Sequence, residues 1–214
     1  MSNAPFIPAL RYHFLTPLFD PAMRWIMREE RFKRPLLDQA KIQPGQTILD
    51  LGCGTGTLTI QAKRHQPEAE VFGLDIDPRI LQRARLKAQA VRVAITFDQG
   101  AADLMPYPDQ FFDRILSSLV IHHLTTSQKQ QAMNELYRVL RPGGELHLVD
   151  FGRPRSLYAR LLGWFIASQE EAADNIQGLL PGMMEQAGLH DVVETNQFTT
   201  ILGGLSLYRA RKPE

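Results

Sequence analysis

The chain has 214 residues, and its 24 basic and 23 acidic side chains leave a formal net charge of +1. This length fits a single domain, 1–214, and the balance of charge excludes a global field that would attract nucleic acid or an anionic membrane. The single cysteine excludes an intrachain disulfide, no run reaches the roughly 18 apolar residues of a membrane span, and the N-terminus lacks a signal-peptide core. We expect a cytoplasmic protein that acts on a small molecule, without nucleic acid, stable membrane insertion or a metal; nothing indicates an oligomeric state.

Residues 1–43 are rich in aromatic side chains and are expected to form a helical cap on the protein. Pro17 and Pro21 mark a break, after which 22–39 is expected to be helical with an interruption near Pro35. Large aromatic clusters pack on sheets and also roof apolar pockets. The cap therefore either covers one edge of a sheet or also encloses a substrate pocket.

A short apolar run followed by three glycines is the most informative stretch of the chain. Residues 47–51 have the pattern of a buried parallel strand, and 56–65 that of a helix, with Thr55 or Thr57 expected as its N-cap. The glycines between them allow tight turns and let a ligand lie against the main chain. A dinucleotide fingerprint would need its third glycine at position 57, which is a threonine.

The sequence LDLGCGTG resembles motif I of the class I S-adenosylmethionine (SAM) dependent methyltransferases, which has an acid two positions before the first glycine. The resemblance implies that Gly52, Gly54 and Gly56 let the backbone approach the cofactor. It implies that Asp50 orients this loop and, through water, the methionine ammonium of SAM. Cys53 lies within the same cofactor loop, where we expect a small packed side chain rather than a nucleophile.

Strands over 70–75 and 92–97, with a helix over 78–90 between them, are expected next, as in a doubly wound sheet. Asp75 ends the first of these strands, where a carboxylate can accept bonds from both hydroxyls of a ribose. Ile76 is expected on the adenine face. The dipeptide Asp-Pro that follows is expected to be the N-cap and first residue of the helix.

The sequence QGAADLMPYPDQFFD resembles the next signature of the family, usually written around GDAxxLPFPDxxFD. Ala101 stands where the family commonly has an acid that accepts a bond from the adenine amino group. That contact is lost, supplied by Asp103 from a shifted loop, or left to the backbone of Ala102. Met105 and Tyr107 either pack near the adenine or anchor the loop.

A fourth strand is expected over 113–120, with two histidines directly after it. The backbone around Ser118 and Leu119 is expected to hold the amino-acid part of the cofactor. His122 and His123 are candidate general bases if the acceptor is a hydroxyl, because imidazole titrates near neutral pH. Alternatively, one histidine caps the next helix and the other is a packing residue.

The second half of the chain is expected to contain a helix over 127–140, a strand over 145–150, a helix over 175–187 and two strands over 191–199 and 205–211. LYRVLRPGGELHLVDF resembles the corresponding stretch of the ubiquinone and menaquinone biosynthesis methyltransferases. The apolar segment 157–168 is a core helix, a lid over the acceptor or an interfacial anchor.

The resemblance implies an α/β fold, a doubly wound Rossmann-like sheet of seven strands that is mostly parallel with an antiparallel C-terminal strand. It divides the domain into a cap (1–43), a cofactor core (44–151), substrate or lid helices (152–190) and a terminal strand pair (191–211). It implies methyl transfer from SAM to a small apolar or aromatic acceptor, leaving S-adenosylhomocysteine, with C-, O- or N-methylation open. The alternatives are a non-catalytic SAM-binding protein and a nicotinamide-dependent oxidoreductase, which lacks the terminal hairpin.

Overall fold

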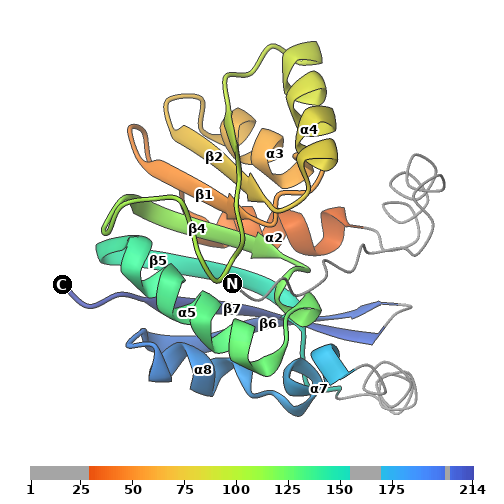
Figure 1. Ribbon diagram of the computed structural model, residues 1–214, viewed down its shortest axis with the longest axis vertical. Coiled ribbons are helices and arrows are strands. Elements are labelled where there is room, and N and C mark those ends of the chain that lie inside the picture. The colour runs from red at the N-terminus through yellow and green to blue at the C-terminus, as the bar shows by residue number, and fades with distance from the viewer. Residues whose placement is uncertain (1–28, 155–169, 201–202) are drawn as a thin grey trace, which may run out of the picture.

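Seven strands form one sheet in the order β3-β2-β1-β4-β5-β7-β6 (Figure 1). The computed structural model describes residues 29–154, 170–200 and 203–214, so most of the expected cap and the apolar segment 157–168 lie outside the described residues. The strands are β1 (Thr47–Leu51), β2 (Glu70–Asp75), β3 (Thr96–Gln99), β4 (Phe112–Ser118), β5 (Leu140–Phe151), β6 (His190–Thr200) and β7 (Gly203–Arg211).

The first five strands are parallel to one another, and β7 runs antiparallel to both of its neighbours, β5 and β6. All five residues of β1 are buried, as expected for a central parallel strand that is covered on both faces. The predicted fold class, a mostly parallel seven-stranded sheet with an antiparallel C-terminal strand, is confirmed.

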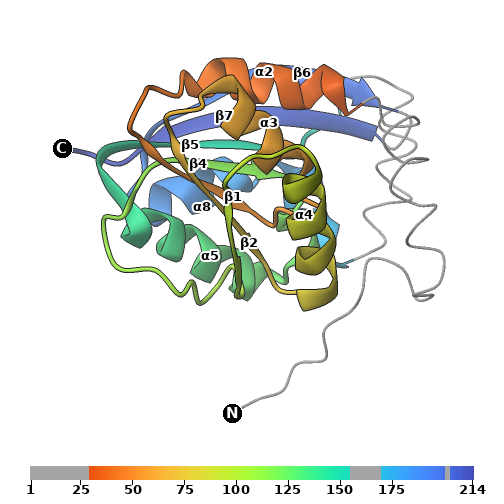
Figure 2. The same ribbon diagram turned by 90° about the horizontal axis from the view of Figure 1, so that it is seen from above.

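Helices cover both faces of the sheet, with α2 on one side and α5 and α8 on the other (Figure 2). Their bounds are α2 (Glu30–Ala40), α3 (Thr57–His65), α4 (Pro78–Ala90), α5 (Thr126–Val139), α7 (Glu170–Gln177) and α8 (Leu180–Gln186), and a short 3₁₀ helix, η1 (Ile121–His123), precedes α5. Two clusters on one face pack α2, α3 and α4 on the sheet, and a larger cluster on the other face packs α5 and α8. The alternating residues Ile48 and Leu49 of β1 belong to opposite faces.

Two expected helix details are wrong at the start of the domain. The helix does not break near Pro35, because α2 continues through it; burial of Phe32 and Leu36, worth about 1.5–3 kcal/mol each, offsets the roughly 3 kcal/mol that an internal proline costs. Neither Thr55 nor Thr57 caps α3. Gly56 occupies the cap position with φ +72° and no side-chain cap bond, a left-handed conformation that favours glycine.

Three further boundaries differ from the expected ones. β3 begins at Thr96 rather than at residue 92, where Arg92, with φ 55°, lies in a turn after α4. The single helix expected over 175–187 is two helices, α7 and α8, separated at Gly178, whose φ of +73° lies outside the helical region. β5 begins at Leu140 and includes the Pro-Gly-Gly stretch, where the register with β4 shifts.

The carboxyl ends of the five parallel strands lie at one edge of the sheet, which is where open α/β sheets bind ligands. The loops that follow β1, β2, β3, β4 and β5 therefore share this edge. Every residue that the sequence singled out for cofactor binding or catalysis lies on these strand ends and loops.

Candidate functional site

The loop after β1 turns through three left-handed glycines, with φ values of +66° at Gly52, +53° at Gly54 and +72° at Gly56. A Cβ added to Gly52 would lie 2.2 Å from Cγ2 of Val120, and one added to Gly56 would lie 3.1 Å from Cβ of Ala84. A Cβ on Gly54 would meet nothing within 4 Å. Packing therefore requires the outer glycines, whereas the middle one presents bare backbone to open space.

Asp75 joins this loop to the end of β2. Its Oδ2 accepts a 2.9 Å bond from the N–H of Gly54, and its Oδ1 accepts a 3.0 Å bond from the N–H of Asp77. Burial raises the pKa of Asp75, and these two bonds oppose the rise. Each carboxylate oxygen keeps a lone pair for another donor. The next side chain, Ile76, is 47% exposed although it is apolar.

The predicted start of α4 is confirmed. Asp77 is its N-cap, and the Asp77 side chain accepts a hydrogen bond from Arg79 N–H.

Asp50 lies beneath the glycine loop and is 2% exposed. Its Oδ2 accepts a 2.6 Å bond from the hydroxyl of Thr59. Burial raises its pKa to about 7, although the bond from Thr59 and the charge of Lys33 act in the opposite direction. The side chain therefore changes charge near neutral pH.

Cys53 is buried within the loop, at 7% exposure. Burial, reinforced by the charges of Asp50 and Asp75, raises the pKa of its thiol. A neutral, enclosed thiol is a poor nucleophile, and its Sγ is only 2.9 Å from where a Cβ on Gly73 would lie. These contacts favour the packed side chain over the nucleophile.

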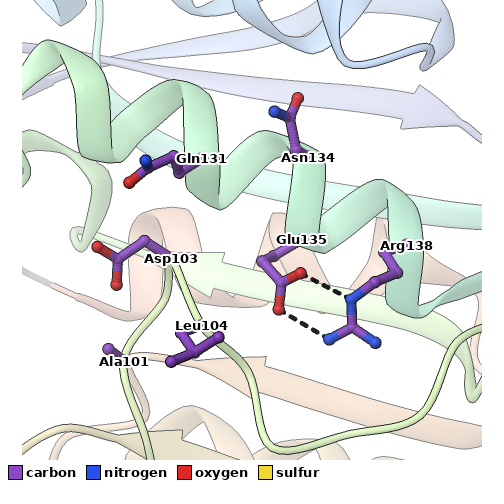
Figure 3. A pocket seen from close by; sticks show the side chains of 7 residues that line it. All are labelled: Ala101, Asp103, Leu104, Gln131, Asn134, Glu135 and Arg138. Carbon is purple, nitrogen blue, oxygen red and sulfur yellow. Dashed lines mark hydrogen bonds and ion pairs between the residues drawn. The ribbon is translucent and has the colours of Figure 1, made fainter.

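The loop after β3 is fastened to α5 and borders an open pocket (Figure 3). Glu135 accepts a 2.8 Å bond from Met105 N–H and is paired with Arg138 at 2.7 Å. Arg138 donates to the carbonyl of Tyr107. The pocket is lined by Ala101, Asp103, Leu104, Gln131, Asn134, Glu135 and Arg138.

The structure shows where the residues with alternative predicted roles in this loop lie. Met105 and Tyr107 are buried in the larger core cluster, which favours their role as loop anchors. Asp103 lines the pocket beside α5, and Ala101 forms an isolated bridge with Leu104. Adenine recognition by Asp103 or by the backbone of Ala102 stays a prediction.

The loop after β4 is held by a buried carboxylate that the sequence did not single out. Asp150, at the end of β5, is fully buried. Its Oδ2 accepts bonds from three consecutive backbone N–H groups, those of Val120 (3.1 Å), Ile121 (2.8 Å) and His122 (3.4 Å). Leu119, just before them, is left-handed with φ 60° and donates to Val149 O. The buried hydroxyl of Ser118 has no hydrogen-bond partner within the described part of the chain.

The same carboxylate binds the side chain of His122. Asp150 Oδ1 lies 2.7 Å from Nδ1 of His122 and also accepts a 2.7 Å bond from Phe151 N–H. Burial by itself would raise the pKa of Asp150, but the charge and hydrogen bond of His122, with the bond from Phe151, hold it below its usual range. Asp150 is therefore an ionised partner for the imidazole.

The two candidate histidines differ in their surroundings. The His122 side chain is 14% exposed and packs against the Phe151 ring, with centroids 4.8 Å apart. His123 is exposed, and its ring centroid is 4.0 Å from that of His122. Neither caps α5, because Thr125 forms the capping box with Gln128.

Sequence reasoning missed Asp150 although a signal was present. The fourth and fifth strands of a doubly wound sheet are neighbours, so an acid that ends the fifth lies beside the loop after the fourth. In the described ranges 29–154, 170–200 and 203–214, no group of three or more His, Cys, Asp or Glu side chains could hold a metal. None of the helices described there is long and apolar enough to cross a bilayer.

The chain is similar to known methyltransferases. A family model described as a methyltransferase domain matches residues 48–144. Over 186 residues the chain is 35% identical to an uncharacterized methyltransferase of Synechocystis sp., which covers 86% of this chain and 84% of that protein. Over 206 residues it is 32% identical to a ubiquinone/menaquinone biosynthesis C-methyltransferase of Vibrio cholerae, and the alignment covers 85% of this chain and 77% of that protein. It is 36% identical over 148 residues to a demethylmenaquinone methyltransferase of Thermus thermophilus, which covers 68% of this chain but only 63% of that protein.

Solved structures share the fold. The phosphoethanolamine N-methyltransferase 2 of Haemonchus contortus, in complex with SAM, has a TM-score of 0.76 at 16% identity and covers 98% of this chain and 62% of that one. A putative methyltransferase of Bacillus halodurans has a TM-score of 0.69 at 20% identity, and the match covers 86% of this chain and 100% of that one. At these identities the likeness concerns the fold alone.

Proposed function

This chain belongs to the class I SAM-dependent methyltransferases, and from that premise we propose that it methylates a small, largely apolar or aromatic acceptor. Membership of this family removes the nicotinamide-dependent oxidoreductase as an alternative. Methyl transfer to any small molecule would exclude the other one, a non-catalytic SAM-binding protein. The proposal adds which residues hold SAM and what kind of molecule receives its methyl group.

The glycine loop and Asp75 are the proposed binding site of the cofactor. Open space above Gly54 leaves room for a ligand against bare backbone. Asp75 has one lone pair left on each oxygen after its two backbone bonds, which fits the two hydroxyls of a ribose. The exposed side chain of Ile76 offers an apolar surface for adenine. These features support the proposed placement of the ribose and adenine of SAM at this loop.

The remaining roles at this edge follow from position. Asp50 would orient the methionine ammonium through water, and the backbone at Ser118 and Leu119 would take the amino-acid part of SAM. Ala101 and Ala102 would border the adenine from the loop after β3. When SAM is bound, its sulfonium supplies an electrophilic methyl group, so the protein mainly aligns the acceptor and excludes water. Such alignment lowers barriers by about 7–11 kcal/mol in favourable cases.

The names of the relatives carry the proposal for the acceptor. Two of them are named for quinone chemistry, as methyltransferases of ubiquinone/menaquinone biosynthesis or of demethylmenaquinone. A balanced net charge of +1 gives no general attraction for a polyanion. An aromatic ring of small size is therefore the acceptor we expect.

The test measures S-adenosylhomocysteine released from SAM with a panel of quinols, phenols and simple aromatic amines. Release that depends on an aromatic acceptor, and that Asp75→Ala reduces at limiting SAM, supports the proposal. Unfolding midpoints with SAM, S-adenosylhomocysteine and NADH report binding separately, because a ligand at 100 times its Kd stabilises by about 2.7 kcal/mol. Methyl transfer only to nucleic acid or protein would contradict the proposed acceptor.

A further inference from the structure

Helix α4 and the turn after it concentrate positive charge that the balanced composition of the whole chain conceals. Five of the chain's 24 basic side chains and none of its 23 acidic ones lie within residues 78–97. The five are Arg79, Arg83, Arg85, Lys87 and Arg92. Charges more than about 8 Å apart are largely screened at physiological salt. A surface in contact with α4 therefore responds to this local charge and not to the net charge of +1.

One side of α4 is buried, and the opposite side is exposed. Leu81, Ala84 and Ala88 pack in the core beneath the helix. The residues that follow the opposite side at helical spacing are all exposed, and we call them the outer face of α4: Arg79, Gln82, Arg83, Leu86, Gln89 and Ala90. At 1.5 Å per residue this face is about 17 Å long. Both views show α4 on the outside of the molecule (Figures 1 and 2).

The two arginines of the outer face are not used by the fold. The guanidinium groups of Arg79 and Arg83 form no ion pair or hydrogen bond with another described residue. Arg85, in contrast, donates to the carbonyl of Phe97, and Lys87 donates to a hydroxyl of α3. Two exposed cations without a partner in the described part of the chain remain available to a partner molecule.

The acids that flank this segment already have hydrogen-bond donors. Asp77 accepts from Arg79 N–H at the start of α4, and Asp98 accepts from the hydroxyl of Tyr107. Both lie beyond the ends of the segment 78–97. The outer face therefore presents positive charge without an interspersed acid.

This face fits an anionic partner with an apolar layer beneath its charges. A second copy of the chain is excluded as an isologous partner, because a symmetric contact would set arginine against arginine. Leu86 is 60% exposed in the middle of the face, and an apolar side chain is stabilised at the boundary between lipid headgroups and acyl chains. Single-stranded nucleic acid is bound by aromatic side chains that stack on its bases, and the outer face has none.

We propose that the outer face of α4 binds an anionic membrane surface, with Arg79 and Arg83 at the lipid headgroups and Leu86 at their boundary with the acyl chains. The choice of a membrane rests on the proposed function, since an apolar acceptor partitions into lipid. α4 begins at Pro78, shortly after Asp75, so its first turn adjoins the edge proposed to bind SAM. Binding of this kind is peripheral and reversible.

The test is sedimentation of the full chain with vesicles of phosphatidylcholine, with or without an equal amount of phosphatidylglycerol, at low and at high salt. Arg79→Gln/Arg83→Gln removes two charges from the outer face. Arg31→Gln/Arg34→Gln is the matched control. It removes two exposed arginines from α2, where Arg34 lies 3.9 Å from the carboxylate of Asp38.

We expect the wild type to bind only the vesicles that contain phosphatidylglycerol, and salt to release it. Each basic side chain near such a surface contributes about fivefold in affinity. Arg79→Gln/Arg83→Gln should therefore bind about 25-fold more weakly, and the control variant should stay within about twofold of the wild type. Leu86→Ser should weaken binding to vesicles but not to a DNA oligonucleotide. An unchanged Kd for SAM in every variant shows that the fold is intact.

Methyl transfer gives a second readout. The acceptors are an aromatic molecule with a long alkyl chain, dissolved in the vesicles, and a short water-soluble analogue. Phosphatidylglycerol should raise transfer to the first acceptor by the wild type but not by Arg79→Gln/Arg83→Gln. The two proteins should methylate the soluble analogue at the same rate.

Four results would overturn the proposal: equal binding to both kinds of vesicle, binding to neither, the same loss in the outer-face and control variants, or tighter binding to DNA than to phosphatidylglycerol. The last would assign the face to nucleic acid. None of them affects methyl transfer to the soluble analogue, so the proposed function would stand. Transfer to no aromatic molecule, in vesicles or in water, would instead contradict the proposed function itself.

Discussion

The buried carboxyl of Asp50 should make the free protein less stable as pH rises. Its pKa is 3.8 in the reference state and about 7 in the fold, chiefly because burial disfavours the charge. A folded-state pKa above the unfolded one gives a stabilising contribution that is fully present below the unfolded value. That contribution is lost as pH rises through the folded value. The window is therefore about pH 4 to 7.

The magnitude follows from the two pKa values. At 1.36 kcal/mol per pKa unit, the difference between 3.8 and about 7 corresponds to about 4 kcal/mol at pH 8. Asp50→Asn removes this titration and keeps an oxygen that can accept the bond from Thr59, which is 2.6 Å long in the wild type. The variant should therefore be more stable than the wild type at pH 8 by up to about 4 kcal/mol, and the difference should decrease toward pH 5.

Urea unfolding of both proteins without cofactor, at pH values from 5 to 8.5, measures this difference directly. Subtracting the two curves cancels the titration of groups that the proteins share. Asp50→Leu serves as a control because it removes the carboxyl without keeping the bond to Thr59. A stability difference between wild type and Asp50→Asn that is the same at every pH would refute the assignment of a raised pKa to Asp50.

Three substitutions test the cofactor loop. Asp75→Ala should weaken SAM binding at least tenfold in calorimetry, since two charge-assisted hydrogen bonds of about 1.5–3 kcal/mol each would be lost; an unchanged Kd would remove Asp75 from the site. Gly52→Ala should destabilise the fold by about 2 kcal/mol or more in urea unfolding, because its Cβ meets Val120 and φ is +66°. A Cβ at Gly54 meets open space, so Gly54→Ala should cost only about 1–2 kcal/mol of strain, yet it should weaken SAM binding at least tenfold. Equal losses of stability for Gly52→Ala and Gly54→Ala would contradict the packing argument.

The sequence predicts the buried half of the sheet well and the special backbone conformations poorly. The expected bounds 47–51, 70–75 and 78–90 agree with β1, β2 and α4, because apolar runs and an Asp-Pro start are local signals. Gly56 as a cap and Gly178 between α7 and α8 depend on left-handed φ values that any glycine can adopt. No local pattern says which glycine does so.

Part of the candidate site could also be predicted from local sequence patterns, and part depends on contacts between distant residues. The glycine loop and Asp75 were identified because their spacing along the chain is informative. The pairing of Asp150 with His122 joins residues 28 positions apart, and its hydrogen bonds depend on the course of the loop after β4. The adjacency of β4 and β5 was predictable, but the loop geometry that aims three N–H groups at one oxygen was not.

The two buried aspartates at this edge have opposite electrostatic states, and the difference assigns them different tasks. Asp150 accepts five hydrogen bonds and has a lowered pKa, so it is already ionised and satisfied by the protein. Asp50 accepts from Thr59 alone among the described residues and has a pKa of about 7. An acid with too few donors is suited to a ligand that brings a positive charge, here the proposed methionine ammonium.

This contrast predicts that SAM binding releases a proton from Asp50. The ammonium favours the ionised carboxyl and should lower its pKa from about 7. At pH 6, where the free acid is largely protonated and the ammonium is fully charged, release should approach one proton per SAM bound. Calorimetry in buffers with different ionisation enthalpies counts that proton, and Asp50→Asn should abolish it. If the wild type binds SAM and releases no proton, Asp50 is not the partner of the ammonium, whatever its pKa in the free protein.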